Sequence, residues 1–350
     1  MKLADLNIAG RPIGPAHPPF VIAEMSGNHN GDLDRALAIM EAAKDAGADA
    51  VKLQTYTANT ITLDHDGPEF RIKGGPWDGR RLYDLYQEAH TPWDWHGALF
   101  DKGRELGLVV FSSPFDETAV TFLEELNCPA YKIASFEAVD LPLIARTAAT
   151  GKPLIISTGM ADRQEIDEAV HGARENGVGG LALLHCVSAY PAAPEEANLR
   201  TIPDLAATFD VVVGLSDHTP GIGVAVASVA LGACFIEKHF TLSRDDGGPD
   251  AAFSLEPQEL EALTRECRAA WEALGNVCYE RTAGEKGNVL LRRSLYVVKD
   301  IAQGEAFTEE NIRSIRPGHG LSPKHYEEIL GRKAKGALTR GTALQWSDIE

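Results

Sequence analysis

The stretch GLSDHT at Gly214–Thr219, followed by CFIEKHF at Cys234–Phe240, indicates the fold more clearly than any other part of the sequence. In each segment a histidine, His218 or His239, follows a short apolar run of the kind that forms a buried strand. Gly221–Gly232 lies between them, is rich in Ala, Val and Gly, and is long enough for one helix. A strand, a helix and a second strand form a unit whose strands run parallel. We therefore expect both imidazoles at one rim of a sheet, close enough to share a metal ion.

An alternative for His218 and His239 is that they are unrelated and satisfied by local hydrogen bonds. The shared site is favoured because each histidine ends a strand-like run, and because Glu237 and Lys238 bring further charge to the same rim. Two histidines leave a metal ion with open coordination positions, which suits Mn²⁺, Zn²⁺ or Fe²⁺. Such an ion can polarise a carbonyl oxygen, so the pair indicates chemistry on a carbonyl compound.

Six further strand-like runs precede this unit, and stretches of helical spacing alternate with them. The runs are Phe20–Met25, Ala50–Gln54, Leu108–Ser113, Ala130–Ser135, Pro153–Ser157 and Leu181–Cys186. Eight strands that alternate with helices favour a closed parallel (β/α)₈ TIM barrel over an open doubly wound sheet. Tyr56–Ala89 lies outside this repeat and is expected to be a long irregular insertion, whose aromatic residues favour a lid or a substrate wall.

Polar residues at the carboxyl ends of the predicted strands would all point at one mouth of the barrel. In chain order they are Glu24, Lys52, Gln54, Ser113, Lys132, Ser135, Ser157, Ser188, Ser216, His218 and His239. A lysine inside a barrel mouth is costly without an anion, so the two lysines indicate an anion site. The serines suit a phosphate and a carboxylate on one small molecule, although each could equally be a helix cap. Glu24 is the best candidate for a general acid or base, and Glu137 could substitute for it.

Composition narrows the classes of partner and the domain organisation. The chain has 350 residues and a net charge of −18, which argues against nucleic acid and anionic membranes as partners. Its first residues lack a signal-peptide core, and its five cysteines are scattered, so a cytoplasmic protein with reduced thiols is expected. We expect a barrel domain over residues 1–280, a linker over 281–287, and a small, glycine-punctuated domain over 288–350.

The motifs, taken together, resemble those of the sialic acid synthase family, which condenses phosphoenolpyruvate with an amino sugar. The resemblance covers nearly the whole chain and rests on AEMSGNHNGD (23–32), VKLQTY (51–56), FSSPFD (111–116), YKIAS (131–135), ISTGM (156–160), GLSDHT, EKHF and IRPGHGL (315–321). It implies the TIM barrel and, at the C-terminus, a small antifreeze-like (SAF, β-clip) domain. Within the family, the sequences of these motifs are most similar to those of the branch that makes pseudaminic acid.

The resemblance also implies a role for each site residue. His218 and His239 would hold a divalent metal, typically Mn²⁺, with Mg²⁺ or Co²⁺ as alternatives. Phosphoenolpyruvate would be held around its carboxylate by Lys52, Ser113, Lys132 and Ser135, and at its phosphate by Ser157, Ser188 and Ser216. The neuraminate-making branch more usually has Asn where Ser188 stands. Glu24 would handle protons or orient water, and Gln54, Tyr190 and Asp250 would contact the sugar. Arg316 would reach the sugar from the partner subunit, which implies a domain-swapped homodimer.

Three functions stay open at this stage. The first is a pseudaminic acid synthase that uses 2,4-diacetamido-2,4,6-trideoxy-L-altrose. The second is an N-acetylneuraminate or legionaminate synthase that uses a mannose-type amino sugar, and the third is a non-catalytic sugar-binding protein. The altrose derivative lacks a 6-hydroxyl, so its pocket should be apolar at that end. Aromatic residues of the insertion, Trp77, Tyr83, Tyr86 and Trp93, would either form this wall or pack the insertion onto the barrel.

Overall fold

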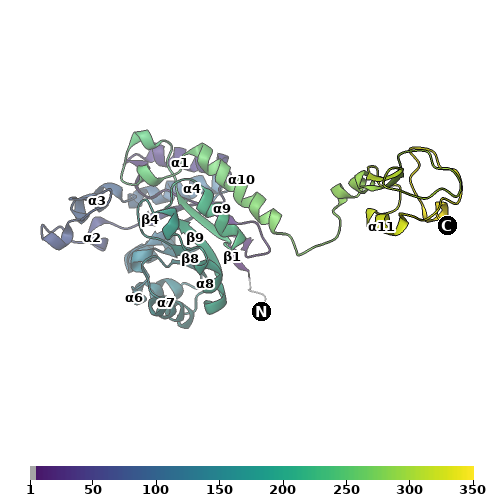
Figure 1. Ribbon diagram of the computed structural model, residues 1–350. Helices are drawn as coiled ribbons and strands as arrows, with labels where there is room; N and C mark the ends of the chain where they lie inside the picture. Colours follow the sequence, from purple (N-terminus) through teal and green to yellow (C-terminus); the bar gives the residue numbers. More distant parts are fainter. Residues whose placement is uncertain (1–4) are drawn as a thin grey trace. The chain divides into compact units, whose positions relative to one another are not determined.

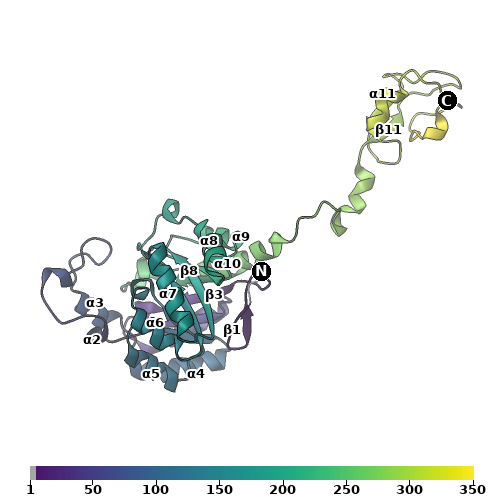
Figure 2. The ribbon, with the colours of Figure 1, turned by 90° about the horizontal axis from the view of Figure 1, so that it is seen from below.

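A closed barrel of eight parallel strands forms the first part of the computed structural model, which describes residues 5–350 (Figures 1 and 2). Its strands are β3 (Phe20–Glu24), β4 (Ala50–Thr55), β5 (Val109–Pro114), β6 (Tyr131–Ile133), β7 (Pro153–Ser157), β8 (Gly180–Cys186), β9 (Val212–Asp217) and β10 (Phe235–His239). Each strand pairs with the next in the chain, and β10 pairs with β3 to close the ring. The predicted (β/α)₈ barrel is therefore confirmed, and the two histidine segments form its last two strands.

A layer of helices packs around the barrel and covers its outer apolar side chains. The helices are α1 (Leu33–Asp45), α4 (His96–Leu106), α5 (Glu117–Glu125), α6 (Leu141–Ala148), α7 (Arg163–Glu175), α8 (Thr201–Phe209), α9 (Gly223–Ala230) and α10 (Pro257–Leu274). Aspartates cap four of them by accepting hydrogen bonds from first-turn amides, namely Asp32, Asp116, Asp140 and Asp162. These carboxylates therefore stabilise helix starts and do not belong to the barrel mouth.

Alternation along the strands decides which side chains enter the barrel. On β10, Phe235, Glu237 and His239 share one face, because successive strand residues point to opposite sides. Glu237 lies level with Ser216 of β9, and Lys238 lies level with Asp217. One face of this strand pair therefore presents the mouth residues, whereas the other presents a second charged pair toward the helices.

Three local features differ from the expectation drawn from the sequence. An antiparallel hairpin, β1 (Leu6–Ile8) and β2 (Arg11–Ile13), precedes the barrel and packs against β7 and β8. The insertion is not irregular throughout, since it contains the helices α2 (Ala58–Ile61) and α3 (Leu82–Ala89). Ser135 was expected in the fourth barrel strand but lies after it, in a short 3₁₀ turn. All three are short local structures, of eight residues or fewer, for which apolar periodicity is a weak signal.

A second compact unit, Asn276–Glu350, follows the barrel unit, which ends at Gly275. It contains an antiparallel strand pair, β11 (Ser294–Val297) and β12 (Ile312–Ile315), and one short helix, α11 (Tyr326–Ile329). It buries its own apolar core, formed by Leu295, Val297, Ile301, Phe307, Ile312, Ile329, Ala334, Leu344 and Ile349. Within residues 5–350, no helix has both the length and the apolar character needed to cross a membrane.

Candidate active site

Glu237 lies at the centre of a buried charge cluster in the barrel mouth. Its Oε1 atom is 3.3 Å from Lys132 Nζ and 3.6 Å from Lys52 Nζ, and it accepts a hydrogen bond from Ser216 Oγ at 3.0 Å. Lys52 Nζ also lies 2.8 Å from Glu24 Oε2. The four ionisable side chains are almost completely buried and come from β3, β4, β6 and β10. Two positive and two negative groups thus face one another across the barrel.

The pKa values in this cluster follow from burial and from the neighbouring charges. Burial alone would raise the pKa of Glu237, but Lys132 and Lys52 lower it to about 2, so this carboxylate stays ionised. Burial would lower the pKa of Lys52, yet Glu237 and Glu24 together raise it. For Lys132 burial prevails, and its pKa is lowered. Burial raises the pKa of Glu24 despite the adjacent Lys52, which makes Glu24 a better proton carrier near neutral pH than an exposed glutamate.

Side chains around the cluster hold Glu24 and Lys52 in place. Gln54 Nε2 donates to Glu24 Oε1 at 2.9 Å and to Ser26 Oγ at 3.0 Å. Lys52 Nζ donates to Ser113 Oγ at 3.2 Å. Since both carboxylate oxygens of Glu24 face named partners, the orientation of this carboxyl group is fixed before any substrate binds.

Two of the expected substrate-binding serines, Ser135 and Ser188, converge around Gly159. Its backbone N–H donates to Ser135 Oγ at 3.2 Å, and a Cβ atom at Gly159 would lie 2.2 Å from Ser188 Oγ and 2.7 Å from Ser135 Oγ. Only glycine therefore allows these loops to approach so closely. Ser157 Oγ is buried and has no hydrogen-bond partner in the described structure. A buried hydroxyl without a partner is suited to receive a ligand oxygen.

The two histidine rings lie side by side at the mouth, with their centroids 5.4 Å apart. His218 Nδ1 lies 2.9 Å from the backbone oxygen of Val187, a contact in which Nδ1 donates and Nε2 keeps its lone pair. His239 Nδ1 is buried without a hydrogen-bond partner in the described structure, 4.0 Å from Asp250 Oδ2. Burial and the neighbouring His218 hold the pKa of His239 well below its usual value, so its imidazole is neutral and able to bind a metal.

The donor set of this pair fits a divalent cation with open coordination positions. His239 brings an unsatisfied buried nitrogen, and His218 is oriented by its backbone contact. No group of three or more His, Cys, Asp or Glu side chains is placed to bind a metal anywhere in residues 5–350. Cys186 Sγ lies 3.8 Å from His218 Nδ1, and this contact raises the pKa of His218 although burial opposes it. Two imidazoles without a closed protein shell match a catalytic site rather than a structural one.

A second buried ion pair fixes the strand ends that carry the histidines. Lys238 Nζ donates to Asp217 Oδ2 at 3.0 Å and to the backbone oxygen of Thr219 at 2.5 Å. Asp217 Oδ1 in turn accepts from the N–H and the hydroxyl of Thr219, at 2.9 and 2.8 Å. Because Asp217 precedes His218 and Lys238 precedes His239, this pair sets the relative position of the two rings.

The motif SGNHN at 26–30 positions the loop that carries Asp250. Asn28 Nδ2 donates to the backbone oxygen of Phe240 and to Ser254 Oγ, both at 2.9 Å. Asn30 Nδ2 donates to the backbone oxygen of Gly247, and the N–H of Gly27 donates to Asp250 Oδ2 at 3.4 Å. The motif is therefore a support for the histidine side of the mouth rather than part of the charge cluster.

Two further features complete the comparison with the sequence. Arg316 lies in the second unit, so its role in the site stays a prediction. The sequence predicts Glu237 only as a charge on the rim, whereas the structure places it at the centre of the charge cluster. Its spacing of two residues from His239 on one strand was the available signal, since it places both on the same face.

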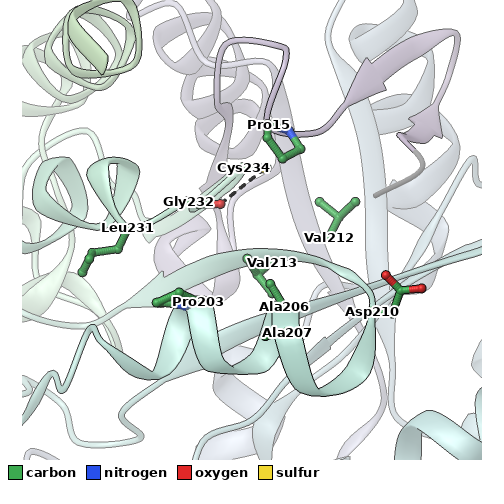
Figure 3. Close-up of a pocket in the computed structure, with 10 residues that line it drawn as sticks. All are labelled: Pro15, Pro203, Ala206, Ala207, Asp210, Val212, Val213, Leu231, Gly232 and Cys234. Carbon is green, nitrogen blue, oxygen red and sulfur yellow. Dashed lines mark hydrogen bonds between the residues drawn. The ribbon is translucent and has the colours of Figure 1, made fainter. Parts of the chain in front are cut away.

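The cavity drawn in Figure 3 lies away from these groups. It has a volume of about 480 Å³ and is lined by α8, by the start of β9 and by the segment before β10. Pro203 and Ala206 of α8 face Val212 and Val213 across it, and no mouth residue named above lines it. In barrels of this type the carboxyl ends of the strands carry the chemistry, and this cavity is at the opposite ends.

Comparisons with known proteins identify the family. Residues 39–279 match the model of the NeuB family, and residues 292–350 match that of the SAF domain. The chain belongs to the NeuB family. A pseudaminic acid synthase of Campylobacter jejuni is 46% identical over 94% of this chain and 96% of its own length. A pseudaminic acid synthase of Helicobacter pylori is 46% identical over 95% of this chain and 98% of its own length. The predicted membership of the sialic acid synthase family, the SAF domain and the prediction of an enzyme are thereby confirmed.

Solved structures of NeuB-family proteins agree with this assignment. A crystal structure of an N-acetylneuraminic acid synthetase from Leptospira borgpetersenii, in complex with citrate, has a TM-score of 0.73 and 32% identity over 81% of this chain and 95% of that one. The spore coat polysaccharide biosynthesis protein SpsE of Bacillus subtilis has a TM-score of 0.67 and 35% identity, and covers 99% of both chains. The likeness to the second structure therefore extends over both units of this chain.

Glu137 provides a test of the electrostatics of the mouth. Burial raises its pKa to about 7, and its Oε2 atom has no hydrogen-bond partner in the described structure. A raised carboxyl pKa contributes stability below the unfolded value of about 4.5, and this contribution is lost as pH rises through about 7. We predict that the unfolding free energy of Glu137→Gln, compared with that of the wild type at the same pH, rises by about 1–3 kcal/mol as the pH increases from 4.5 to 8. Urea unfolding across this range measures the difference.

The matched control for this prediction is Glu125→Gln, at an exposed position on α5. Its stability relative to the wild type should not change across the same pH range. If the difference in unfolding free energy between Glu137→Gln and the wild type is as independent of pH as that of the control, the Glu137 carboxyl group ionises in the folded protein as it does in water.

Proposed function

We propose that this protein condenses phosphoenolpyruvate with 2,4-diacetamido-2,4,6-trideoxy-L-altrose and water, to give pseudaminic acid and phosphate. The observation that carries the proposal is the pair of buried lysines beside two neighbouring histidines in one barrel mouth. The choice of sugar is supported by relatives named pseudaminic acid synthase, at 45–46% identity, whereas a relative named N,N'-diacetyllegionaminic acid synthase is 40% identical.

Phosphoenolpyruvate would bind across the charge cluster. Lys52 and Lys132 direct their ammonium groups to a common point beside Glu237, which suits the carboxylate of the substrate. Its phosphate would reach Ser157, whose buried hydroxyl has no partner in the described structure, together with Ser188 beside Gly159 and Ser216 of β9. Ser188 lies within this group, so the hydroxyl there would replace the amide that the neuraminate branch more usually carries at this position.

The aldehyde of the open-chain sugar would lie at the histidine pair. His218 and His239 would hold a divalent cation, for which Mn²⁺ is the first choice, and this ion would polarise the aldehyde oxygen. Asp250, which is buried 4.0 Å from His239, and Tyr190, whose ring lies 4.3 Å from that of His218, are placed to orient the sugar. Gln54 is held beside Glu24 and would contact the sugar from the other side of the mouth.

In the reaction, the methylene carbon of phosphoenolpyruvate attacks the aldehyde carbon and forms the new C–C bond. Positive charge develops at carbon 2, water adds there, and the C–O bond to phosphate breaks. The added water loses both of its protons as carbon 2 becomes a ketone: one goes to the former aldehyde oxygen, and the other goes to the departing phosphate. Glu24 is suited to transfer these protons because burial raises its pKa and Gln54 fixes its orientation. The lysines keep the anionic substrate in register with the aldehyde, which supplies the proximity part of catalysis.

A substrate panel tests the proposed reaction directly. Purified protein with Mn²⁺ and phosphoenolpyruvate is given the altrose derivative, 2,4-diacetamido-2,4,6-trideoxymannose or N-acetylmannosamine, and phosphate release is followed. We expect the highest kcat/KM with the altrose derivative. Turnover of a mannose-type sugar without turnover of the altrose derivative would make the protein a legionaminate or neuraminate synthase instead.

The same assay separates a synthase from a non-catalytic sugar-binding protein. Phosphate release that does not depend on any added sugar would reject the synthase. Lys52→Ala serves as the control for the anion site, because it removes one charge-assisted contact. Its KM for phosphoenolpyruvate should rise about 10- to 100-fold, and an unchanged KM would remove Lys52 from the site.

Arg316 would complete the sugar site of a second copy of the chain in a domain-swapped homodimer. Co-expression of Arg316→Ala and Lys132→Ala chains with different tags tests this arrangement. Each variant alone should be inactive, whereas the doubly tagged dimer contains one barrel with intact lysines and one intact Arg316 from the other chain. We expect it to recover about half of the wild-type rate. An inactive doubly tagged dimer, or a failure to obtain one, would contradict the exchange of Arg316 between subunits.

A further inference from the structure

We infer that Trp77, from the insertion between β4 and α4, is a specificity-determining residue that selects sugars with a methyl group rather than a hydroxymethyl group at carbon 6. This inference rests on the proposed synthase activity, because it places the sugar with its aldehyde at the histidine pair. Trp77 would thereby give the insertion a role in substrate selection, although the barrel repeat itself does not require this insertion.

The structure separates Trp77 from Tyr86 and Trp93. Tyr86 packs edge-on against Tyr56, with ring centroids 5.7 Å apart. Trp93 stacks on Phe122 at 4.7 Å and donates its indole N–H to the backbone oxygen of Tyr56. Both side chains contact Tyr56, which directly follows β4, and so pack the insertion onto the barrel.

Trp77 contacts the side chains that pack directly on the histidine pair. Its ring lies 5.5 Å from that of Tyr190 and 6.2 Å from that of Phe253. Tyr190 packs on His218 at 4.3 Å, and Phe253 packs on His239 at 5.0 Å. The three aromatic rings thus form a wall that begins at the two imidazoles and ends at Trp77.

The indole has no polar group left for the sugar. Its single donor, Nε1, is used by the backbone oxygen of Pro249 at 2.8 Å. This bond connects the insertion to the loop that carries Asp250 and holds the ring in one orientation. Trp77 therefore presents only apolar surface toward the mouth, where a hydroxyl group would find no partner on it.

The dimensions of the wall match those of an open-chain sugar. Five C–C bonds of about 1.5 Å, in an extended chain, carry carbon 6 about 6 Å away from carbon 1. The ring of Tyr190 lies 4.3 Å from that of His218 and 5.5 Å from that of Trp77. The indole is therefore no farther from the ring of His218 than the sum of these two distances. With carbon 1 at the histidine pair, carbon 6 reaches the far part of the wall. A methyl group loses only its contact with water there, whereas a hydroxymethyl group also loses hydrogen bonds.

The test compares two sugars that differ only at carbon 6, namely the altrose derivative and its 6-hydroxy analogue, with wild-type protein and with Trp77→Ala. We expect the wild type to prefer the 6-deoxy sugar by at least tenfold in kcat/KM. Trp77→Ala should reduce this preference by about tenfold, mainly by slowing the 6-deoxy sugar. Trp77→Phe keeps an apolar ring and should retain most of the preference, and Trp93→Phe, the matched control, should leave it unchanged.

Equal kcat/KM for the two sugars with the wild type would overturn the inference without any variant. An unchanged preference in Trp77→Ala would overturn it as well, as would an equal loss for both sugars. If the wild type accepts only mannose-type sugars, the proposed function fails, and the same comparison is made with a mannose pair that differs at carbon 6. The two failures are therefore distinguishable.

Discussion

The ionised carboxylate of Glu237 is the contact on which the barrel mouth depends. It lies between Lys52 and Lys132, which come from two other strands, and accepts the hydroxyl of Ser216 from a third. Without it, Lys132 would lose its carboxylate partner and Lys52 would keep only Glu24, so burial would favour loss of a proton from this pair. With it and Glu24, Lys52 keeps a raised pKa although it is buried. The mouth can therefore keep two buried ammonium groups in place while the protein as a whole carries a net charge of −18.

Burying charged groups in this way is not a route to greater stability. A buried ion pair is often no more stabilising than well-packed apolar residues, whereas removal of one partner costs about 3–5 kcal/mol. The chain contains two such arrangements at the end of the barrel, the Glu237 cluster inside and the Asp217–Lys238 pair outside. Glu237 is two residues from His239, and Asp217 and Lys238 each directly precede a histidine. Their position indicates that they orient the strand ends that carry His218 and His239.

Much of this could be predicted from the sequence, and the limits have a physical origin. Strand and helix periodicity predicted the barrel, because both faces of its strands are buried and their apolar runs are unambiguous. The histidine pair could be placed at one rim for the same reason. The partners of Glu237 could not be predicted, since they depend on which strands face each other across the barrel. The separation of Trp77 from Tyr86 and Trp93 likewise depends on how the insertion folds back, which no local pattern encodes.

The most direct measurement is a crystal structure of the protein with Mn²⁺ and phosphoenolpyruvate. We predict one cation bound by both His218 and His239, with the carboxylate of phosphoenolpyruvate within hydrogen-bond distance of Lys52 and Lys132 and with Glu237 still between the two lysines. A cation bound elsewhere, or phosphoenolpyruvate held away from both lysines, would contradict the assignment of this mouth as the place where the two substrates meet.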